Sequence, residues 1–209
     1  GTPLNKQEMR NALYRGRCTR MLDKLCCSPE FLIATGRSIN KERMKDQYVV
    51  LRAMAFLMLH RGEFKDIPAL QYRGDIDDFL ARFMVYVNDN APEKLIVDYE
   101  NLFIRCMQIS YDLLGENGFR FSGNGIRRPI NMPLFEALSY LFSFVPEKID
   151  YTWASRLILD IESVKEEFDD SRYFSGNIDS TTSVSFRFDR MDKIITGFSY
   201  DKTYKNKRL

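Results

Sequence analysis

Histidine is nearly absent from this chain of 209 residues, since His60 is the single one. A ββα-metal (HNH-type) nuclease needs one histidine as the base and another for the metal, so we do not expect that reaction here. The sequence also lacks a Walker phosphate loop, a G-x-S-x-G elbow and an H-E-x-x-H zinc motif. His60 lies at the end of an apolar stretch, where we expect it to cap the last carbonyl groups of a helix.

Cysteine is sparse as well, and none of the four residues, Cys18, Cys26, Cys27 and Cys106, belongs to a C-x-x-C pair. The neighbours Cys26 and Cys27 cannot bridge each other without strain, and no spacing matches a tetrahedral zinc pattern. We therefore expect free, buried thiols, which suit a protein of the reducing cytoplasm. No residues predict a metal site, and none forms a catalytic constellation.

Long hydrophobic runs are missing too. The longest cluster, "VVLRAMAFLML" at 49–59, is interrupted by a charge and is too short to cross a bilayer. We expect no membrane partner. The composition, 44% hydrophobic and 29% charged residues, is instead typical of a globular protein with a substantial core.

Helical periodicity is what the sequence does contain, and convincing strand patterns are absent apart from a doubtful "FRF" at 119–121. The spacing of apolar residues and glycine stops predicts an all-α fold of about eight helices in one irregular bundle. Asp75 is expected to cap one of them. The helices are expected at 5–16, around 21–25, and at 39–62, 74–89, 93–118, 130–145, 152–168 and 182–195, with the helix at 39–62 in the centre.

The first helix has the clearest local signals. Asn5 and Glu8 have the spacing of a capping box, and Gly16 is expected to end the helix. Met9, Ala12 and Leu13 form its apolar stripe, which in an amphipathic helix faces the core.

Charge is unevenly distributed although the net charge is only +2. Residues 1–61 hold 12 Lys/Arg against 5 Asp/Glu, whereas residues 62–119 hold 5 against 11. The basic opening suits contact with nucleic acid or phosphate. It suits equally well an ion-pairing partner in the acidic middle segment or in a neighbouring acidic protein.

Two pairs of arginines are candidates for contact with phosphate or nucleic acid. Arg127 and Arg128 follow the flexible stretch "SGNG", where the backbone can approach a phosphate closely. Arg187 and Arg190 lie about one turn apart on the last predicted helix. An exposed Gly/Arg loop without a ligand is the simpler interpretation of the first pair.

Several stretches resemble, in order, a bacterial ParB/sulfiredoxin-like family of unknown function typified by the GmrSD modification-dependent restriction system. "GTPLNKQEMRNALYRG" is similar to the segment that closes its ParB-like domain, and "RMKDQYVVLRAMAF" to its R-x-x-D-x-x-x-x-L-R helix. "GFRFSGNGIRRPINMPLFEALS" resembles its F-R and R-R-x-I-N segment, and "TTSVSFRFDRMDKII" its last helix.

The resemblance implies that a ParB-like α/β domain, which carries a D-G-Q-Q-R motif for a nucleotide triphosphate with Mg²⁺, precedes this chain. Residues 1–16 would then be the seam helix that closes that domain, and 17–209 the helical domain, with a sub-boundary near 118–130. Glu8, Arg10 and Asn11 match the family's Q-E-x-R-N pattern and would border the nucleotide pocket. No cofactor is expected in this chain itself.

Glu8 and Arg10 also have a purely structural interpretation, in which Glu8 caps the helix and Arg10 pairs with a neighbour. If Arg10 is instead one exposed charge, its removal should hardly change stability. For the whole chain, the resemblance predicts the helical C-terminal part of a restriction or anti-phage protein that also contacts DNA. The alternative is a non-catalytic helical module that binds a partner protein, whose apolar contacts would be far less sensitive to salt than contacts with DNA.

Overall fold

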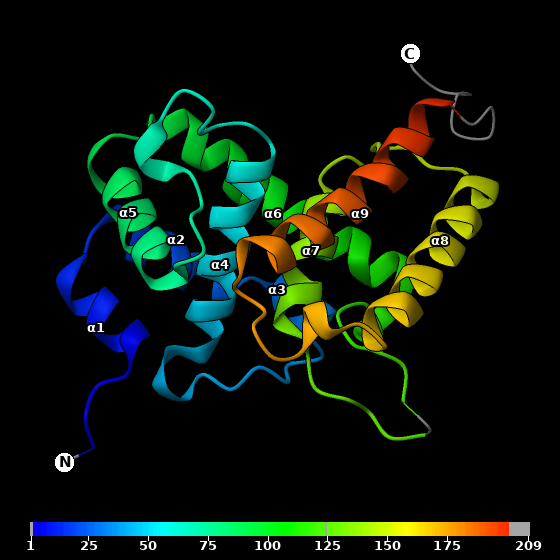
Figure 1. Cartoon of the computed structure of the whole chain (residues 1–209), viewed down its shortest axis with the longest axis horizontal. Helices are drawn as coiled ribbons and strands as arrows, with labels where there is room; N and C mark the ends of the chain where they lie inside the picture. The colour runs from blue at the N-terminus through cyan, green and yellow to red at the C-terminus, as the bar shows by residue number, and fades with distance from the viewer. Residues whose placement is uncertain (1, 124, 201–209) are drawn as a thin grey trace.

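The computed structural model describes residues 2–123 and 125–200, and within these ranges every regular element is a helix. The all-α prediction is therefore confirmed. Figure 1 shows the arrangement of the elements. They are α1 (Lys6–Leu13), α2 (Arg17–Cys26), α3 (Pro29–Ala34), η1 (Glu42–Met44), α4 (Lys45–His60), η2 (Pro68–Leu70), α5 (Ile76–Asp89), α6 (Glu93–Leu114), η3 (Gly115–Asn117), α7 (Met132–Phe142), α8 (Tyr151–Asp169), η4 (Arg172–Phe174) and α9 (Thr181–Tyr200).

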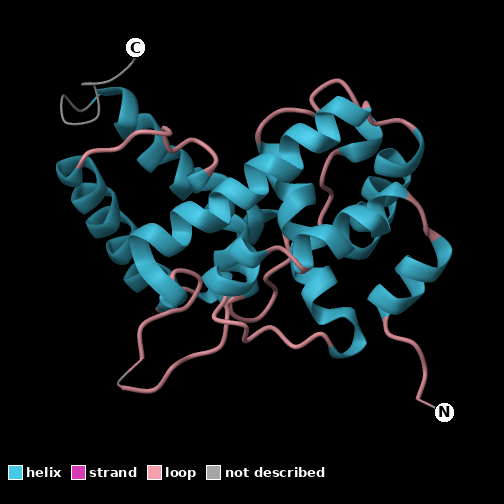
Figure 2. Ribbon diagram, turned by 180° about the vertical axis from the view of Figure 1, so that it is seen from behind, coloured by secondary structure: helices cyan, strands magenta, loops and turns pink. Residues whose placement is uncertain are grey.

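Helix α4 occupies the centre, as its nearly continuous apolar sequence predicts. It packs against α1, α2, α5, α6 and α7, and its residues 49–58 are all buried. The helices α1, α2 and α5 lie toward one end of the molecule and α8 toward the other (Figures 1 and 2). Helix α7 packs on both α4 and α6, so one hydrophobic core continues across the sub-boundary expected near 118–130. Among the described residues no helix is long and apolar enough to span a membrane.

Helix starts follow local capping chemistry. The predicted capping box is confirmed, since the Asn5 side chain accepts from the Glu8 backbone N–H and the Glu8 carboxylate accepts from the Asn5 N–H. Asp75 caps α5 as predicted. The sequence prediction missed α3, although Ser28 caps it and Pro29 occupies its first turn, a frequent helix-start pattern.

Helix α4 begins later than predicted. Arg43 and Met44 have φ values of 55° and 59°, in the left-handed region, so the backbone cannot continue as one helix from Ile39. The predicted helix at 39–62 is corrected to a turn of 3-10 helix followed by α4. Two successive non-glycine residues in this conformation are unusual and place the Arg43 side chain beside α1.

Helix α1 is oriented opposite to its amphipathic pattern. Gln7 and Arg10 are buried, whereas Met9 and Leu13 are exposed by 42% and 74%. The expectation that the Met9–Leu13 stripe faces the core is wrong. The polar side faces inward because α4 and α5 supply hydrogen-bond and ion-pair partners for it.

The turn between α1 and α2 is held by Asn88 of α5. The Asn88 amide donates to the Tyr14 carbonyl at 2.9 Å, and its Oδ1 accepts from the Cys18 N–H at 2.9 Å. Gly16 allows this approach, because a Cβ at Gly16 would lie 2.6 Å from Asn88 Oδ1. Gly16 thus has a steric role at the start of α2, whereas α1 ends earlier than predicted, at Leu13.

All four cysteines are free. Three of them, Cys18, Cys26 and Cys106, are buried as predicted, whereas Cys27 is exposed. Burial raises the pKa of the Cys18 and Cys106 thiols to about 12, so both remain protonated and unreactive at neutral pH.

Candidate functional site

The α1 seam residues lie beside η1, although the two segments are more than thirty residues apart in the chain. The Glu8 carboxylate pairs with the Arg43 guanidinium at 3.1 Å, and the Asn5 amide donates to the Arg43 carbonyl at 2.8 Å. Asn11 donates to Gln47 at the start of α4. Of the three predicted seam residues, Glu8 thus contacts Arg43 of η1 and Asn11 contacts the start of α4.

These segments enclose an open pocket of about 540 Å³, which we call the α1 pocket. Its lining includes three cationic side chains from two directions, Lys6 and Arg10 from α1 and Arg43 from η1. Lys45 adds a fourth cation, and Tyr48 and Asp77 complete the inner wall.

Arg10 is not the exposed charge that the sequence suggested. Its Nη1 pairs with Asp77 Oδ1 at 2.8 Å and its Nε donates to Gln7 at 3.1 Å. Lys6 pairs with the same carboxylate. Partial burial opposes ionisation of Asp77, but the bonds from Lys6 and Arg10 outweigh it and lower its pKa. This arrangement supports the structural interpretation of Arg10 and explains why α1 buries its polar side.

Tyr48 connects the α1 pocket to the core. The centre of its ring lies 5.3 Å from the Arg10 guanidinium carbon and 5.6 Å from the Arg52 guanidinium carbon. Two cations therefore contact the same aromatic ring. The Tyr48 hydroxyl also accepts from Arg52 Nη1 at 3.2 Å.

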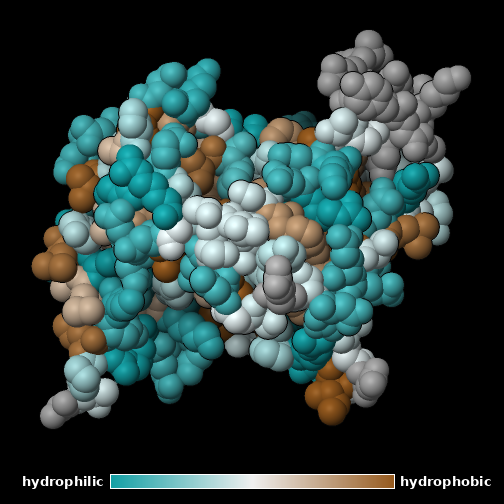
Figure 3. All heavy atoms as spheres, viewed as in Figure 1, coloured by the Kyte–Doolittle hydropathy of each residue, from teal (hydrophilic) through white to brown (hydrophobic). Residues whose placement is uncertain are grey.

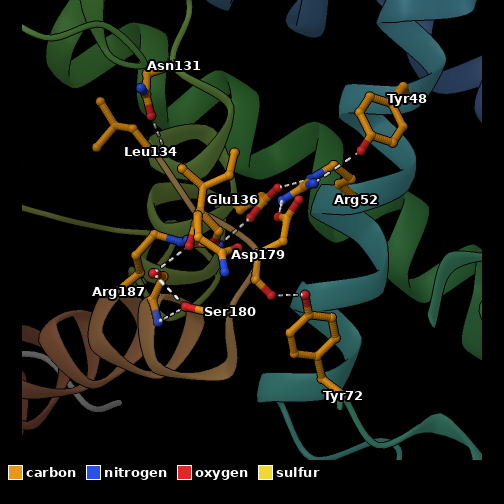
Figure 4. Close-up of polar contacts among 12 residues, drawn as sticks. Tyr48, Arg52, Tyr72, Asn131, Leu134, Glu136, Asp179, Ser180 and Arg187 are labelled. Carbon is orange, nitrogen blue, oxygen red and sulfur yellow. Dashed lines mark hydrogen bonds and ion pairs between the residues drawn. The ribbon is translucent and has the colours of Figure 1, made fainter. Parts of the chain in front are cut away.

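Arg52 belongs to a buried ionic cluster centred on Glu136, shown in Figure 4. One Glu136 oxygen pairs with Arg52 from α4 and the other with Arg187 Nη2 from α9, the latter at 3.1 Å. Arg52 Nη2 further pairs with Asp179 at 2.7 Å. Arg52, Glu136 and Arg187 have no exposed side-chain surface, whereas Asp179 is 27% exposed.

The Glu136 cluster fixes the segment before α9 as well as the helices. The Arg187 Nη1 donates to the Ile178 carbonyl at 2.6 Å, and the Tyr72 hydroxyl donates to the Asp179 carbonyl at 2.5 Å. Two cations and two anions compensate one another inside the core. Arg52, Glu136 and Arg187 have no surface that a substrate could contact, so we interpret this cluster as structural.

The sequence prediction missed this cluster, although a signal was present. Arg52 is the one charge within residues 49–59, and Glu136 is the one charge within 130–145. Single charges of opposite sign inside two strongly apolar helices indicate a buried pair, because an unpaired charge there would be prohibitively costly. The participation of Asp179 and Tyr72 had no comparable signal.

The candidate arginines separate into different environments. Arg187 was expected to contact phosphate at the surface; that expectation is wrong, because its guanidinium is fully buried and paired with Glu136. Its neighbour Arg190 points to α8 instead, where it pairs with Glu167 at 2.6 Å. Arg127 and Arg128 line a different pocket together and pair with Glu116 and Asp169.

The expectation that His60 caps the last carbonyl groups of its helix is wrong, because among the described residues its side chain donates to none of them. Its ring stacks on Phe188 at 3.6 Å between centroids, with Tyr140 and Phe56 nearby, and its Nε2 has no hydrogen-bond partner. Burial, with a smaller contribution from Arg187, lowers the pKa of His60 to about 3. His60 is therefore a neutral core residue rather than a base at neutral pH.

Within residues 2–123 and 125–200, no group of three or more His, Cys, Asp or Glu side chains could hold a metal ion. Comparisons of the chain with protein-family profiles, with curated proteins and with solved structures found no match.

Proposed function

We propose that this chain is the helical part of a GmrSD-like restriction or anti-phage defence protein, and that its α1 face docks against a ParB-like, nucleotide-dependent domain. One observation carries this proposal: α1 buries its polar side and leaves Met9 and Leu13 uncovered. A surface helix normally does the reverse. Figure 3 shows hydrophobic surface at the edge of the molecule over α1. Such a face suits burial against another protein surface.

The α1 pocket gives secondary support. It lies on the polar side of α1 and collects side chains from two of the stretches with the family resemblance, including Arg10 and Arg43. In this proposal the nucleotide triphosphate and Mg²⁺ belong to the ParB-like domain. The role of Glu8, Arg10 and Asn11 is to hold α1 in the orientation that presents its apolar side.

Contact with DNA forms a second part of the proposal. Of the four arginines expected to contact phosphate, Arg127 and Arg128 are the two that are substantially exposed and line the same pocket. Binding through them would weaken as salt is raised, because phosphate contacts release counterions.

The rival function is a non-catalytic module that binds a separate partner protein. The exposed stripe of α1 favours it equally, since an apolar patch does not identify the protein that covers it. The gene sequence upstream of the Gly1 codon distinguishes the two. A D-G-Q-Q-R motif there supports the ParB-like domain, and an unrelated coding sequence would overturn it in favour of the rival.

The docking face itself is tested by Leu13→Glu, with Leu159→Glu of α8 as the matched control, since both leucines are largely exposed. The ParB-like domain, expressed separately, is titrated with each variant by calorimetry. We expect Leu13→Glu to weaken binding about tenfold or more, because a buried leucine contributes about 1.5–3 kcal/mol. Leu159→Glu should bind like the wild type. Equal affinity of all three proteins would remove α1 from the interface.

A further inference from the structure

A second pocket, of about 650 Å³, lies between η3, residues 120–123 and 125–128, and α8, away from α1. We call it the Arg120 pocket. Its lining includes Asn117, Arg120, Ser122, Arg127, Arg128 and Lys165. Among the described residues of the lining there are four cationic side chains and two carboxylates, those of Glu116 and Glu162. The wall therefore carries an excess of positive charge.

Arg120 is the most unusual of these cations. It is only 4% exposed, and none of the hydrogen bonds that it makes to described residues is to a carboxylate. It donates instead to the carbonyls of Glu116, Thr35 and Arg128 and to the Ser38 hydroxyl. Burial lowers its pKa, with repulsion from Arg127 as a smaller cause. A buried cation whose hydrogen bonds go to neutral acceptors is only weakly compensated, here by the more distant charge of Glu116.

The same contacts make Arg120 a rigid part of the wall. They tie the end of α3, the η3 turn and the segment before α7 to a single guanidinium. Phe119 and Phe121 on either side are buried, and the doubtful strand at 119–121 is instead an irregular segment. A fixed cation costs little reorganisation when an anion binds next to it.

Lys165 supplies a second buried cation from α8. It is 4% exposed, and its ammonium group donates to Glu162 at 3.0 Å and to the Asn117 carbonyl at 3.3 Å. Lys165 and Arg120 thus give the pocket two nearly buried positive charges. A surface loop whose arginines merely face solvent would have no such inner wall.

Arg127 and Arg128 complete the pocket near its opening. Arg127 pairs with Glu116 at 2.8 Å, and both of these side chains are about half exposed. Arg128 pairs with Asp169, donates to the Ser122 carbonyl at 3.2 Å and lies 5.3 Å from the centre of the Phe121 ring. Exposed ion pairs of this kind contribute little stability, so an incoming anion can replace the carboxylates.

We propose that the Arg120 pocket binds the phosphate group of a phosphorylated ligand, with Arg120 and Lys165 as its inner wall and Arg127 and Arg128 as replaceable partners at its opening. Forked guanidinium donors suit phosphate oxygens. The volume lies within the range of small-ligand sites. The phosphate could belong to a small molecule or to a nucleic acid, and only the second source rests on the proposed function. The site does not depend on docking at α1.

Calorimetric titration of the full chain with pyrophosphate at low salt tests the proposal. We expect saturable binding that Arg127→Gln weakens about tenfold, since a charge-assisted hydrogen bond contributes about that much. Lys165→Gln should weaken it similarly. Because Arg127 is exposed, its substitution leaves the fold intact even if Lys165→Gln does not. No pyrophosphate or duplex binding by the wild type, or equal affinities of wild type and Arg127→Gln, would overturn the proposal.

A matched pair of charge-removing variants distinguishes a site from general electrostatics. Glu116→Gln and Asp78→Asn each remove an exposed carboxylate from its ion pair with an arginine, Arg127 or Arg82, and each raises the net charge by one. Only Glu116→Gln should strengthen pyrophosphate binding, by about tenfold; an equal effect of Asp78→Asn would overturn the site.

A labelled DNA duplex identifies the source of the phosphate. Duplex binding that pyrophosphate displaces and that Arg127→Gln weakens assigns the pocket to nucleic acid and supports the proposal. Pyrophosphate binding without duplex binding also supports it and assigns the pocket to a small molecule. Failure of docking at α1 would affect neither measurement, so the two proposals fail independently.

Discussion

Arg52 and Glu136 form an ion pair between α4 and α7 in which neither side chain has any exposed surface. The pair is not isolated, because the second Glu136 oxygen holds Arg187 and Arg52 also holds Asp179. The carboxylate of Glu136 thus compensates two buried cations at once. Removing it is therefore a more severe change than removing any one arginine.

Glu136→Ala is expected to lower the free energy of unfolding by about 3–5 kcal/mol, because it leaves two buried guanidinium groups short of a counter-charge. Urea denaturation followed by circular dichroism measures this. The control is Glu167→Ala, which removes an exposed carboxylate from its pair with Arg190 and should cost less than about 1 kcal/mol. Similar losses for the two variants would contradict the structural role of the cluster.

His60 predicts a specific dependence of stability on pH. Its pKa is about 3 in the folded chain and about 6.5 when unfolded. Between these values the unfolded chain binds a proton that the folded chain excludes. The stability contribution is complete above about pH 6.5 and is lost as pH falls, by up to about 1.4 kcal/mol per pH unit.

His60→Phe should remove this slope, since the ring stacks on Phe188 and its Nε2 makes no hydrogen bond. We expect the wild type to lose about 2 kcal/mol more than the variant between about pH 7 and pH 5. Carboxylates change little in that interval. Urea denaturation of both proteins at the two pH values decides it, and parallel losses would show that His60 is protonated in the folded chain.

Arg10→Ala is expected to destabilise the chain by about 2 kcal/mol, because the change breaks bonds to Asp77 and Gln7 and removes packing on Tyr48. Thermal melting provides the measurement. Arg15→Ala is the control, since Arg15 is exposed next to the end of the same helix. An unchanged melting temperature for Arg10→Ala would show that the contacts of Arg10 do not stabilise the fold, as expected for an exposed charge.

Gly16→Ala should cost about 2 kcal/mol by displacing Asn88 from its two backbone partners, Tyr14 and Cys18. Gly197→Ala in α9 is the opposite case, because a Cβ there meets no atom within 4 Å. That variant should be neutral or more stable by up to about 1 kcal/mol, since alanine favours a helix. In the double variant Gly16→Ala/Asn88→Ala the two losses should not add. Additive losses of stability would contradict the role of Asn88 in holding the turn between α1 and α2.

Local pattern was sufficient to predict most helices, because apolar spacing, caps and glycine stops are properties of neighbouring residues. It was insufficient for the orientation of α1. Met9 and Leu13 gave the helix an apolar stripe. The residues that bury Arg10, however, are Asp77 of α5 and Tyr48 of α4. Side chains from distant segments outweighed the local amphipathic signal, and only the tertiary structure reveals them.

The candidate sites show the same limit. Flexible backbone and adjacent guanidinium groups indicated Arg127 and Arg128, but nothing in "FRF" indicated that Arg120 would be buried behind them. Helical spacing placed Arg187 and Arg190 on one helix without revealing that one faces the core and the other faces α8. The sequence could identify charged side chains near a surface loop, whereas how far each side chain is buried depends on tertiary packing.

The bond between Arg52 and Asp179 joins residues 127 positions apart in the chain. During synthesis at about 5–20 residues per second, the ribosome adds the residues up to Asp179 on the order of ten seconds after Arg52. Glu136, the buried partner of Arg52, is itself 84 positions later in the chain, so α4 first carries an unpaired charge and then lacks its second partner until Asp179 is made. The central helix of the finished protein should therefore complete its packing only after α7 and the segment before α9 have emerged, and until then chaperones would meet part of its apolar surface still open.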